Sequence, residues 1–205
     1  MSPHHHPSED ILTGYSAGAL EPGFGLVVAA HVEVCAHCRA RIGAFEAISG
    51  AALKALPRAD VGENALANVM ARLDAPVEPV AARDVRPFIE RLPLKPKKWI
   101  APGVWVAGVD TPHAPTNRVY LLSVASGGLT ARHDHSGAEF CAVLSGAYRD
   151  ELGVFAAGDF AAAENELNHQ PIVEGDETCV CLFATEGRLK PQGLLGRIAF
   201  AYANV

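Results

Sequence analysis

The hydrophobic pattern of this chain changes once along its length, and that change limits the folds that the chain can adopt. Residues 8–56 are rich in Ala, Leu and Val and almost free of proline, which favours helices. From about residue 89 the chain consists of short alternating and β-branched runs between glycine-containing turns: GVWVAGV, RVYLLSV, EFCAVL and TCVCLFA. Such runs are typical of an all-β sandwich or barrel. The sequence therefore predicts an α + β protein of two domains, a helical one followed by a β one.

Three helices are expected in the first part of the chain. Ser8 is a suitable N-cap for the first, because its hydroxyl can accept a hydrogen bond from a backbone N–H of the opening turn. The EPG at residues 21–23 ends this helix. A second helix is predicted over residues 24–34, and a third from about Cys35 to Leu56.

A fourth, shorter helix is predicted in the segment between two prolines, Pro57 and Pro76. Its apolar residues recur at i, i+3, i+4 and i+7 and form one stripe: Leu66, Val69, Met70 and Leu73. The stripe either docks on its own helical bundle or enters a groove of a partner protein, and we favour the partner. We place the helical domain at 1–75, a linker at 76–88 and the β domain at 89–205.

Composition narrows the classes of function. No apolar run is long enough to cross a bilayer, and the N-terminus lacks a basic stretch followed by an apolar core, so neither a membrane span nor a secretory signal is expected. The net charge of -6 argues against direct binding to nucleic acid and suits a basic protein partner. Five cysteines, an odd number with two in a CxxC, favour a reducing cytoplasm over a disulfide framework.

The segment HVEVCAHC carries three residues with spacings that suit a metal ion. His31 and Cys35 are four apart and would project from one face of a helix, and Cys38 completes a CxxC. Zn²⁺ prefers four tetrahedral N and S ligands, so a fourth must come from the run His4–His6 or from His37. The alternative is a redox CxxC, with HHH a tag remnant, although a redox pair usually follows a strand. We expect a closed, structural metal site.

A second group of metal-binding residues lies in the β part. His133 and His135 are two apart, so on a strand they point to the same side. Glu139 would return on the next strand, and His169 can come from a later one. Three imidazoles and one carboxylate suit Zn²⁺, Mn²⁺, Fe²⁺ or Ni²⁺, and the spacing does not choose between them.

The three cysteines of the β part are predicted to fill its core. Cys179 and Cys181 are two apart on one strand face, an arrangement that does not easily close a disulfide. Cys141 should share the face of Glu139 and line the interior. Buried free cysteine commonly behaves as a small hydrophobic residue, so core packing is favoured over a redox role.

Two motifs resemble those of known domains. The segment Gly127–Gly146 matches the first cupin motif throughout, and His169 fits the second, with Ala157 where many cupins carry proline. His6 followed by the HxxxCxxC is similar to the zinc anti-sigma domain. In this order, and over nearly the whole chain, the two resemble the ChrR family of anti-sigma factors.

This resemblance implies a fold, two metal sites and a partner. The helical bundle would hold zinc through His6, with His4 or His5 as substitutes, together with His31, Cys35 and Cys38. The β domain would be a cupin, a jelly-roll barrel, with Zn²⁺ or another divalent transition metal held by His133, His135, Glu139 and His169. The protein would be cytoplasmic and would bind and inhibit an extracytoplasmic-function sigma factor. Release would follow singlet oxygen or organic hydroperoxide stress, sensed through the cupin domain.

An enzyme is the competing class. Cupin barrels with such a ligand set include dioxygenases and isomerases, and the zinc domain would then be regulatory. The sequence indicates no substrate and no small-molecule ligand, since no phosphate-cradling loop and no Ser/His/Asp set stands out. A metal scaffold without a partner would leave the isolated fourth helix unexplained. We therefore assign no catalytic residues and place the inhibitor first.

Overall fold

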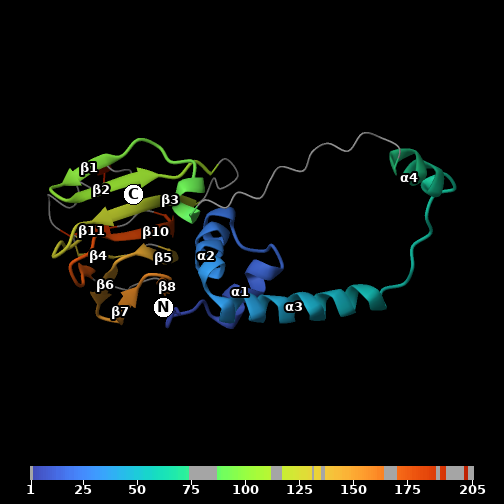
Figure 1. Ribbon diagram of the computed structural model, residues 1–205, viewed down its shortest axis with the longest axis horizontal. Helices are drawn as coiled ribbons and strands as arrows, with labels where there is room; N and C mark the ends of the chain where they lie inside the picture. The colour runs from blue at the N-terminus through green and yellow to red at the C-terminus, as the bar shows by residue number, and fades with distance from the viewer. Residues whose placement is uncertain are drawn as a thin grey trace.

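The computed structural model describes residues 2–73, 87–111, 117–130, 132–134, 137–163, 170–187, 190–192 and 201–202. The described N-terminal part is helical and the later part is predominantly β, as the change in hydrophobic pattern predicts (Figure 1). The helices are α1 (Glu9–Ser16), α2 (Pro22–Val34), α3 (Ala36–Ala55), α4 (Ala65–Leu73) and a single turn, α5 (Phe88–Arg91).

The first two helices begin where their capping residues allow. The Oγ of Ser8 accepts a hydrogen bond from the N–H of Ile11 at 3.3 Å, which confirms the predicted cap. After α1, the chain turns at Gly18, whose φ of 66° favours glycine. Pro22 occupies the first turn of α2, where its missing N–H would have no helical partner. The second helix therefore begins two residues before the predicted start.

The described strands form three antiparallel sheets. A six-stranded sheet has the order β1-β2-β3-β10-β5-β8, a three-stranded sheet the order β7-β6-β9, and β11 pairs with β4. Their bounds are β1 (Lys98–Ala101), β2 (Val104–Gly108), β3 (Asn117–Val124), β4 (His133–Asp134), β5 (Glu139–Ser145), β6 (Ala147–Asp150), β7 (Gly153–Ala156), β8 (Phe160–Ala163), β9 (Ile172–Val173), β10 (Cys179–Glu186) and β11 (Lys190–Pro191).

Strand β5 contributes side chains to two cores, one on each face of the large sheet. Cys141 and Val143 pack with residues of the three-stranded sheet, such as Phe155, and so fill the space between the two sheets. Phe140 and Ala142 alternate with them and belong to the core on the opposite face. The β part is therefore a two-layered sandwich whose large sheet is also covered from outside.

Helix α2 covers this outer face. The rings of Phe24 and Phe140 lie 4.4 Å apart, and Val27 and Val28 are fully buried. One continuous core runs from Leu12 of α1 through α2 into the large sheet. Because α2 is enclosed by helices on one side and strands on the other, it is apolar nearly all round, and FGLVVAAHV shows no single apolar stripe.

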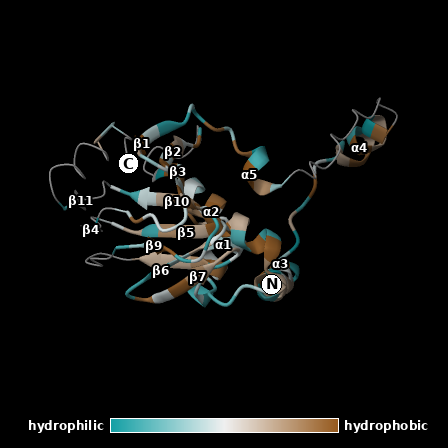
Figure 2. Ribbon diagram, turned by 60° about the vertical axis from the view of Figure 1, so that its left-hand side comes forward, coloured by the Kyte–Doolittle hydropathy of each residue, from teal (hydrophilic) through white to brown (hydrophobic). Residues whose placement is uncertain are grey.

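The end of α3 and the whole of α4 extend away from this body (Figures 1 and 2). Past Ile42, which is buried, α3 exposes Ile48 and Leu53, and Leu56 after its last residue is exposed too. Every residue of the predicted α4 stripe is between 54% and 73% exposed: Leu66, Val69, Met70 and Leu73. The helix lies in the predicted segment between Pro57 and Pro76, and its exposed stripe is not docked on its own bundle, the alternative that we favoured less.

The short helix α5 has no counterpart in the sequence prediction. Its Phe88 and Ile89 pack against the core shared by α2 and the sheet, and Arg91 forms an ion pair with Glu33 of α2. Residues 74–86, most of the predicted linker, lie outside the described residues. The domain limits 1–75, 76–88 and 89–205 stay a prediction.

Candidate metal centre

Four side chains converge at the junction of α2 and α3. The ligand atoms of His6, His31, Cys35 and Cys38 all lie within 4.8 Å of one another. His6 Nδ1 is 3.4 Å from His31 Nε2, 3.4 Å from Cys35 Sγ and 3.5 Å from Cys38 Sγ. Around one Zn²⁺ in a tetrahedron, neighbouring N and S ligands stand roughly 3.3–3.8 Å apart. The four residues predicted from the motifs therefore form a cluster able to hold a metal ion.

The break between α2 and α3 positions the two thiols. Cys35 has an extended backbone, with φ of -98° and ψ of 103°, and its Sγ accepts a hydrogen bond from the N–H of Cys38 at 3.4 Å. The spacing of His31 and Cys35 suggested that both project from one continuous helix. They do not, because α2 ends at Val34 and α3 begins at Ala36. They meet because the chain leaves the helical conformation at Cys35 and directs its sulfur back over the end of α2.

Burial controls the protonation of these ligands. It lowers the pKa of His31 and of His6, which favours the neutral imidazole that a metal requires. Burial, followed by the hydrogen bond with Cys35, raises the pKa of the Cys38 thiol to about 12. The ligand form of cysteine is the thiolate, so metal binding at neutral pH displaces the proton of this thiol.

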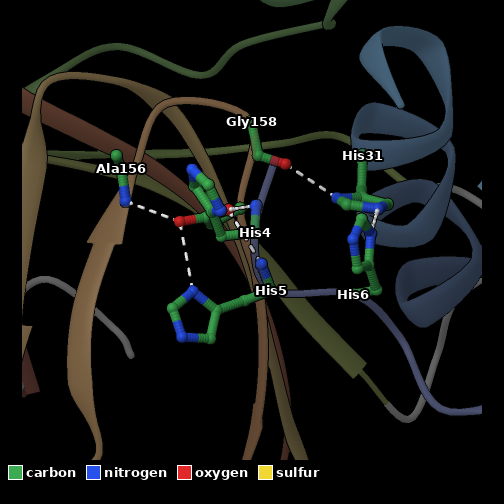
Figure 3. Close-up of polar contacts among 7 residues, drawn as sticks. His4, His5, His6, His31, Ala156 and Gly158 are labelled. Carbon is green, nitrogen blue, oxygen red and sulfur yellow. Dashed lines mark hydrogen bonds and ion pairs between the residues drawn. The ribbon is translucent and has the colours of Figure 1, made fainter. Parts of the chain in front are cut away.

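The β domain takes part in this centre. The Nδ1–H of His31 donates to the carbonyl oxygen of Gly158, at 2.7 Å, in the turn between β7 and β8 (Figure 3). A carbonyl can only accept, so the proton must sit on Nδ1. The Nε2 atom, which is 3.3 Å from Cys38 Sγ, then carries the lone pair that faces the cluster.

The next residue of this turn holds the N-terminal segment. Asp159 Oδ1 accepts from the backbone N–H of His4 at 2.6 Å and of His5 at 3.0 Å, and Oδ2 accepts from the N–H of Ala156 at 2.9 Å (Figure 3). Burial would raise the pKa of Asp159, but these backbone hydrogen bonds outweigh it and lower the pKa. His6 thus enters the cluster while the backbones of His4 and His5 are held by Asp159. These contacts contradict the tag interpretation of HHH.

The second candidate set is described only in part. Glu139 is buried at the start of β5, and burial raises its pKa to about 8. His133 lies on β4, next to β11, but only its backbone is described. His135 and His169 lie outside the described residues. A buried carboxylate is stabilised in its charged form by a nearby cation, which agrees with a ligand role for Glu139; the four-ligand set stays a prediction.

The thiols of the β part lie in its core, where the alternation places them. Cys141, Cys179 and Cys181 are all buried in the space between the sheets. The Sγ atoms of Cys179 and Cys181 are 3.6 Å apart. Burial raises the pKa of the Cys141 thiol. Their packing agrees with the predicted space-filling role.

Sequence reasoning missed two features: the contacts of the β domain with the metal centre, and the exposed apolar residues at the end of α3. Gly158 and Asp159 lie in the stretch of the second cupin motif, which does not point to the helical domain, and they reach the metal centre through contacts between residues 127 to 155 positions apart. No local pattern signals such contacts. The exposure of the apolar residues at the end of α3 could have been predicted from the sequence. The helix α3 is longer than α1 and α2, so these two helices cannot cover Ile48, Leu53 and Leu56 at its far end.

Three comparisons bear on this arrangement. The family model of the ChrR cupin-like domain matches residues 94–189. The anti-sigma-E factor ChrR of Cereibacter sphaeroides is 36% identical over 214 residues, with all of both chains covered. The crystal structure of the anti-sigma ChrR from Rhodobacter sphaeroides, in complex with SigE, matches with a TM-score of 0.78 and 37% identity, and the match covers 90% of this chain and 100% of that one. Within the described residues, no helix is long and apolar enough to span a membrane.

Proposed function

Because this chain belongs to the ChrR family of anti-sigma factors, we propose that it binds and inhibits an extracytoplasmic-function sigma factor in the cytoplasm. The observation that carries the proposal is the match over 90% of the chain to a ChrR whose structure was determined in complex with SigE. That match is too long to rest on the β domain alone. It therefore favours the inhibitor over the metalloenzyme, in which the helical domain would be a regulatory appendage.

The metal of the helical domain is zinc in this proposal. Two imidazoles and two thiolates suit Zn²⁺, and four protein ligands close its coordination shell. Such a site provides structure and has no open position for catalysis. Cys35 and Cys38 lie at the junction of α2 and α3, His31 lies in α2, and His6 lies in the N-terminal segment. The ion would therefore join three segments of the helical domain.

The surface that meets the sigma factor consists of the outer half of α3 and the stripe of α4. These apolar side chains are exposed on helices that project from the body, and large exposed apolar patches mark interaction sites. An apolar helix face laid into a groove is a common mode of recognition. Residues 1–75 carry five Lys or Arg against eight Asp or Glu, which complements the basic surface of a DNA-binding partner.

The cupin domain is the sensor in this proposal. Its site would hold Zn²⁺ or another divalent transition metal through His133, His135, Glu139 and His169. Singlet oxygen or organic hydroperoxides would alter that site and shift the protein away from the sigma-binding state. A signal can do this only if it acts differently on the bound and the released states. The burial of Glu139 at the start of β5 supports a ligand role.

The stripe of α4 provides the sharpest test of sigma binding. Replacing Val69 and Met70 together by Asp (V69D/M70D) would bring two charges into a desolvated groove, so affinity for the co-purifying sigma factor should fall by a factor of at least about 30. Titration calorimetry measures the affinity, and elemental analysis should find the zinc content unchanged.

A matched control places the same two charges on the other face of α4. Asn68 and Ala71 lie opposite the stripe and are exposed, so N68D/A71D should bind the sigma factor as the parent chain does. Equal affinity of V69D/M70D and the parent chain would contradict the role of the stripe. Absence of any sigma factor from the purified chain would contradict the proposed function itself.

A further inference from the structure

The turn between β7 and β8 contacts one metal ligand of the other domain, His31, and the two residues that precede another, His6. Gly158 accepts the Nδ1–H of His31 at 2.7 Å, and Asp159 accepts the N–H groups of the two residues that precede His6. Neither residue is among the four ligands, and neither belongs to the candidate set of the cupin domain. We propose that this turn is a positioning element of the helical domain's metal site, so that the β domain sets how tightly the metal is held.

His31 is oriented through its second ring nitrogen. A metal-binding histidine is oriented by the hydrogen bond of its other ring nitrogen, and loss of such a partner typically weakens metal binding about 10- to 100-fold. Here that partner is a backbone carbonyl of the β domain, 127 positions away in the chain. The ring of His31 is almost fully buried, and Phe160 of β8 lies edge-on to it with ring centroids 6.0 Å apart. The β domain therefore determines both the tautomer and the direction of this ligand.

The position of His6 depends on the segment that precedes it. Terminal segments are mobile unless they are tied down, and an untied ligand must lose conformational entropy when it binds the metal. Asp159 holds the two amides before His6, and the N–H of Phe160 donates to the carbonyl of His5 at 3.1 Å. Asp159 is 2% exposed, so water does not compete freely for these bonds. Contacts with the start of β8 thus hold the N-terminal segment where His6 reaches the cluster.

The two domains approach each other closely at Gly158. Gly158 has a φ of 95°, and a Cβ on it would lie 3.0 Å from Pro3 Cγ and 3.5 Å from Val34 Cγ2. The turn is therefore packed against both the N-terminal segment and the end of α2. A change in the path of this turn must be transmitted to the segments that carry His6 and His31.

The proposal predicts a reciprocal effect that needs no mutation. If the turn positions the ligands, then Zn²⁺ on the ligands must stabilise the turn by the same coupling. In the full-length chain, removal of zinc by a chelator should accelerate hydrogen exchange at the amides of Ala156 and Phe160. The amide of Leu182, in the middle of the large sheet, serves as the internal control. Unchanged exchange at Ala156 and Phe160 would overturn the proposal.

The substitution Asp159→Asn tests the same coupling from the β side. It removes the charge that four hydrogen-bonding contacts share, and transfer of Zn²⁺ from the full-length chain to 4-(2-pyridylazo)resorcinol should become roughly 10- to 100-fold faster. Loading with Co²⁺ in place of zinc reports the ligand geometry through its visible absorption, which should change in the variant. Asp150→Asn is the matched control, because Asp150 also accepts a backbone N–H in a turn, that of Leu152.

A merely structural role of Asp159 predicts a different result. The variant would then lower the melting temperature equally with and without zinc, and its Co²⁺ spectrum would match that of the parent chain; that outcome would overturn the proposal. The proposal expects a larger loss in the zinc-loaded chain. If D159N does not fold, the exchange measurement on the parent chain still decides. The inference rests on the proposed zinc site of the helical domain and not on sigma binding, since no readout involves a sigma factor.

Discussion

Gly146 closes the turn between β5 and β6 with a φ of 68°, and a Cβ there would lie 2.6 Å from the carbonyl oxygen of Thr178. Both the backbone conformation and the space require glycine at this position. Replacing Gly146 by Ala should lower the free energy of unfolding by at least about 2 kcal/mol, through left-handed strain together with displacement of the neighbouring backbone. Urea unfolding of the full chain measures the loss.

Gly50 is the matched control for this prediction. It lies inside α3, without a positive φ, and an added Cβ would meet nothing within 4 Å. Gly50→Ala should therefore raise the free energy of unfolding by about 0.5–1 kcal/mol, because alanine loses less backbone entropy in a helix. Equal effects of the two substitutions would contradict the steric and conformational argument for Gly146.

At the residue scale, spacing predicts which ligand types meet but does not choose among equivalent candidates. The HxxxCxxC predicted three ligands of the helical centre from eight consecutive residues, and the structure brings them together. The choice of His6 over His4 and His5 follows from Asp159 and Phe160, which hold the preceding backbone from the far end of the chain. Sequence spacing contains no trace of those long-range bonds, so the fourth ligand came from the family resemblance alone.

At the scale of elements, α2 has the largest consequences for stability, because it is buried on both sides. Phe24 packs on Phe140, whose ring is in turn edge-on to Phe160 at 5.3 Å. Replacing Phe24 by Ala should cost about 3 kcal/mol or more, since the cavity would open in the core that joins helices to sheet. Chemical denaturation checks this value. Leu56→Ala, at an exposed position, should stay within about 0.5 kcal/mol, and a similar loss at both sites would contradict the shared core.

Element types and positions were predictable here, while their packing was not. Period-two alternation predicted that Cys141 lies inside the sandwich, and the i, i+3, i+4 pattern predicted α4 within a few residues. The continuous apolar character of α2 indicates burial but not which partners bury it. For the same reason the single turn α5 went unpredicted, because four residues show no period, and its position depends on contacts with the core and with Glu33.

At the scale of the whole molecule, the helical and β parts share one core and one set of polar contacts. Glu139 and Phe140 are adjacent on β5, and Phe140 faces α2 on the outer side of the sheet. Strand β8 pairs with β5 from Ala163 opposite Glu139, and it begins directly after Asp159. Glu139, one residue of the candidate cupin set, is therefore joined to the metal centre through two short strands. A sequence pattern cannot reveal this, because the contact between α2 and β5 connects residues more than a hundred positions apart.

This arrangement leads to a prediction about sensing. Replacing His133, His135, Glu139 and His169 together by Ala removes the ligands of the candidate cupin site and leaves α3, α4 and the His6 cluster unaltered. Inhibition of the sigma factor in unstressed cells should remain intact, because the proposed sigma-binding surface is on the helical side. Induction by singlet oxygen and by organic hydroperoxide should be blunted, because the site that distinguishes the two states is gone. A reporter gene under the sigma factor's own promoter measures both effects.

Three results of that experiment have different meanings. Intact inhibition with blunted induction supports a sensor whose signal crosses the shared core. Loss of inhibition without stress, together with zinc loss from the helical centre, would mean that the cupin ligands are needed for the fold that carries the metal centre, and the sensing role would lose its support. Normal induction under both stresses would contradict sensing by this domain outright, since a site that is absent cannot transmit a signal. The metalloenzyme would then become the leading hypothesis for the β domain, and turnover of a small molecule that disappears with the same four substitutions would be its signature.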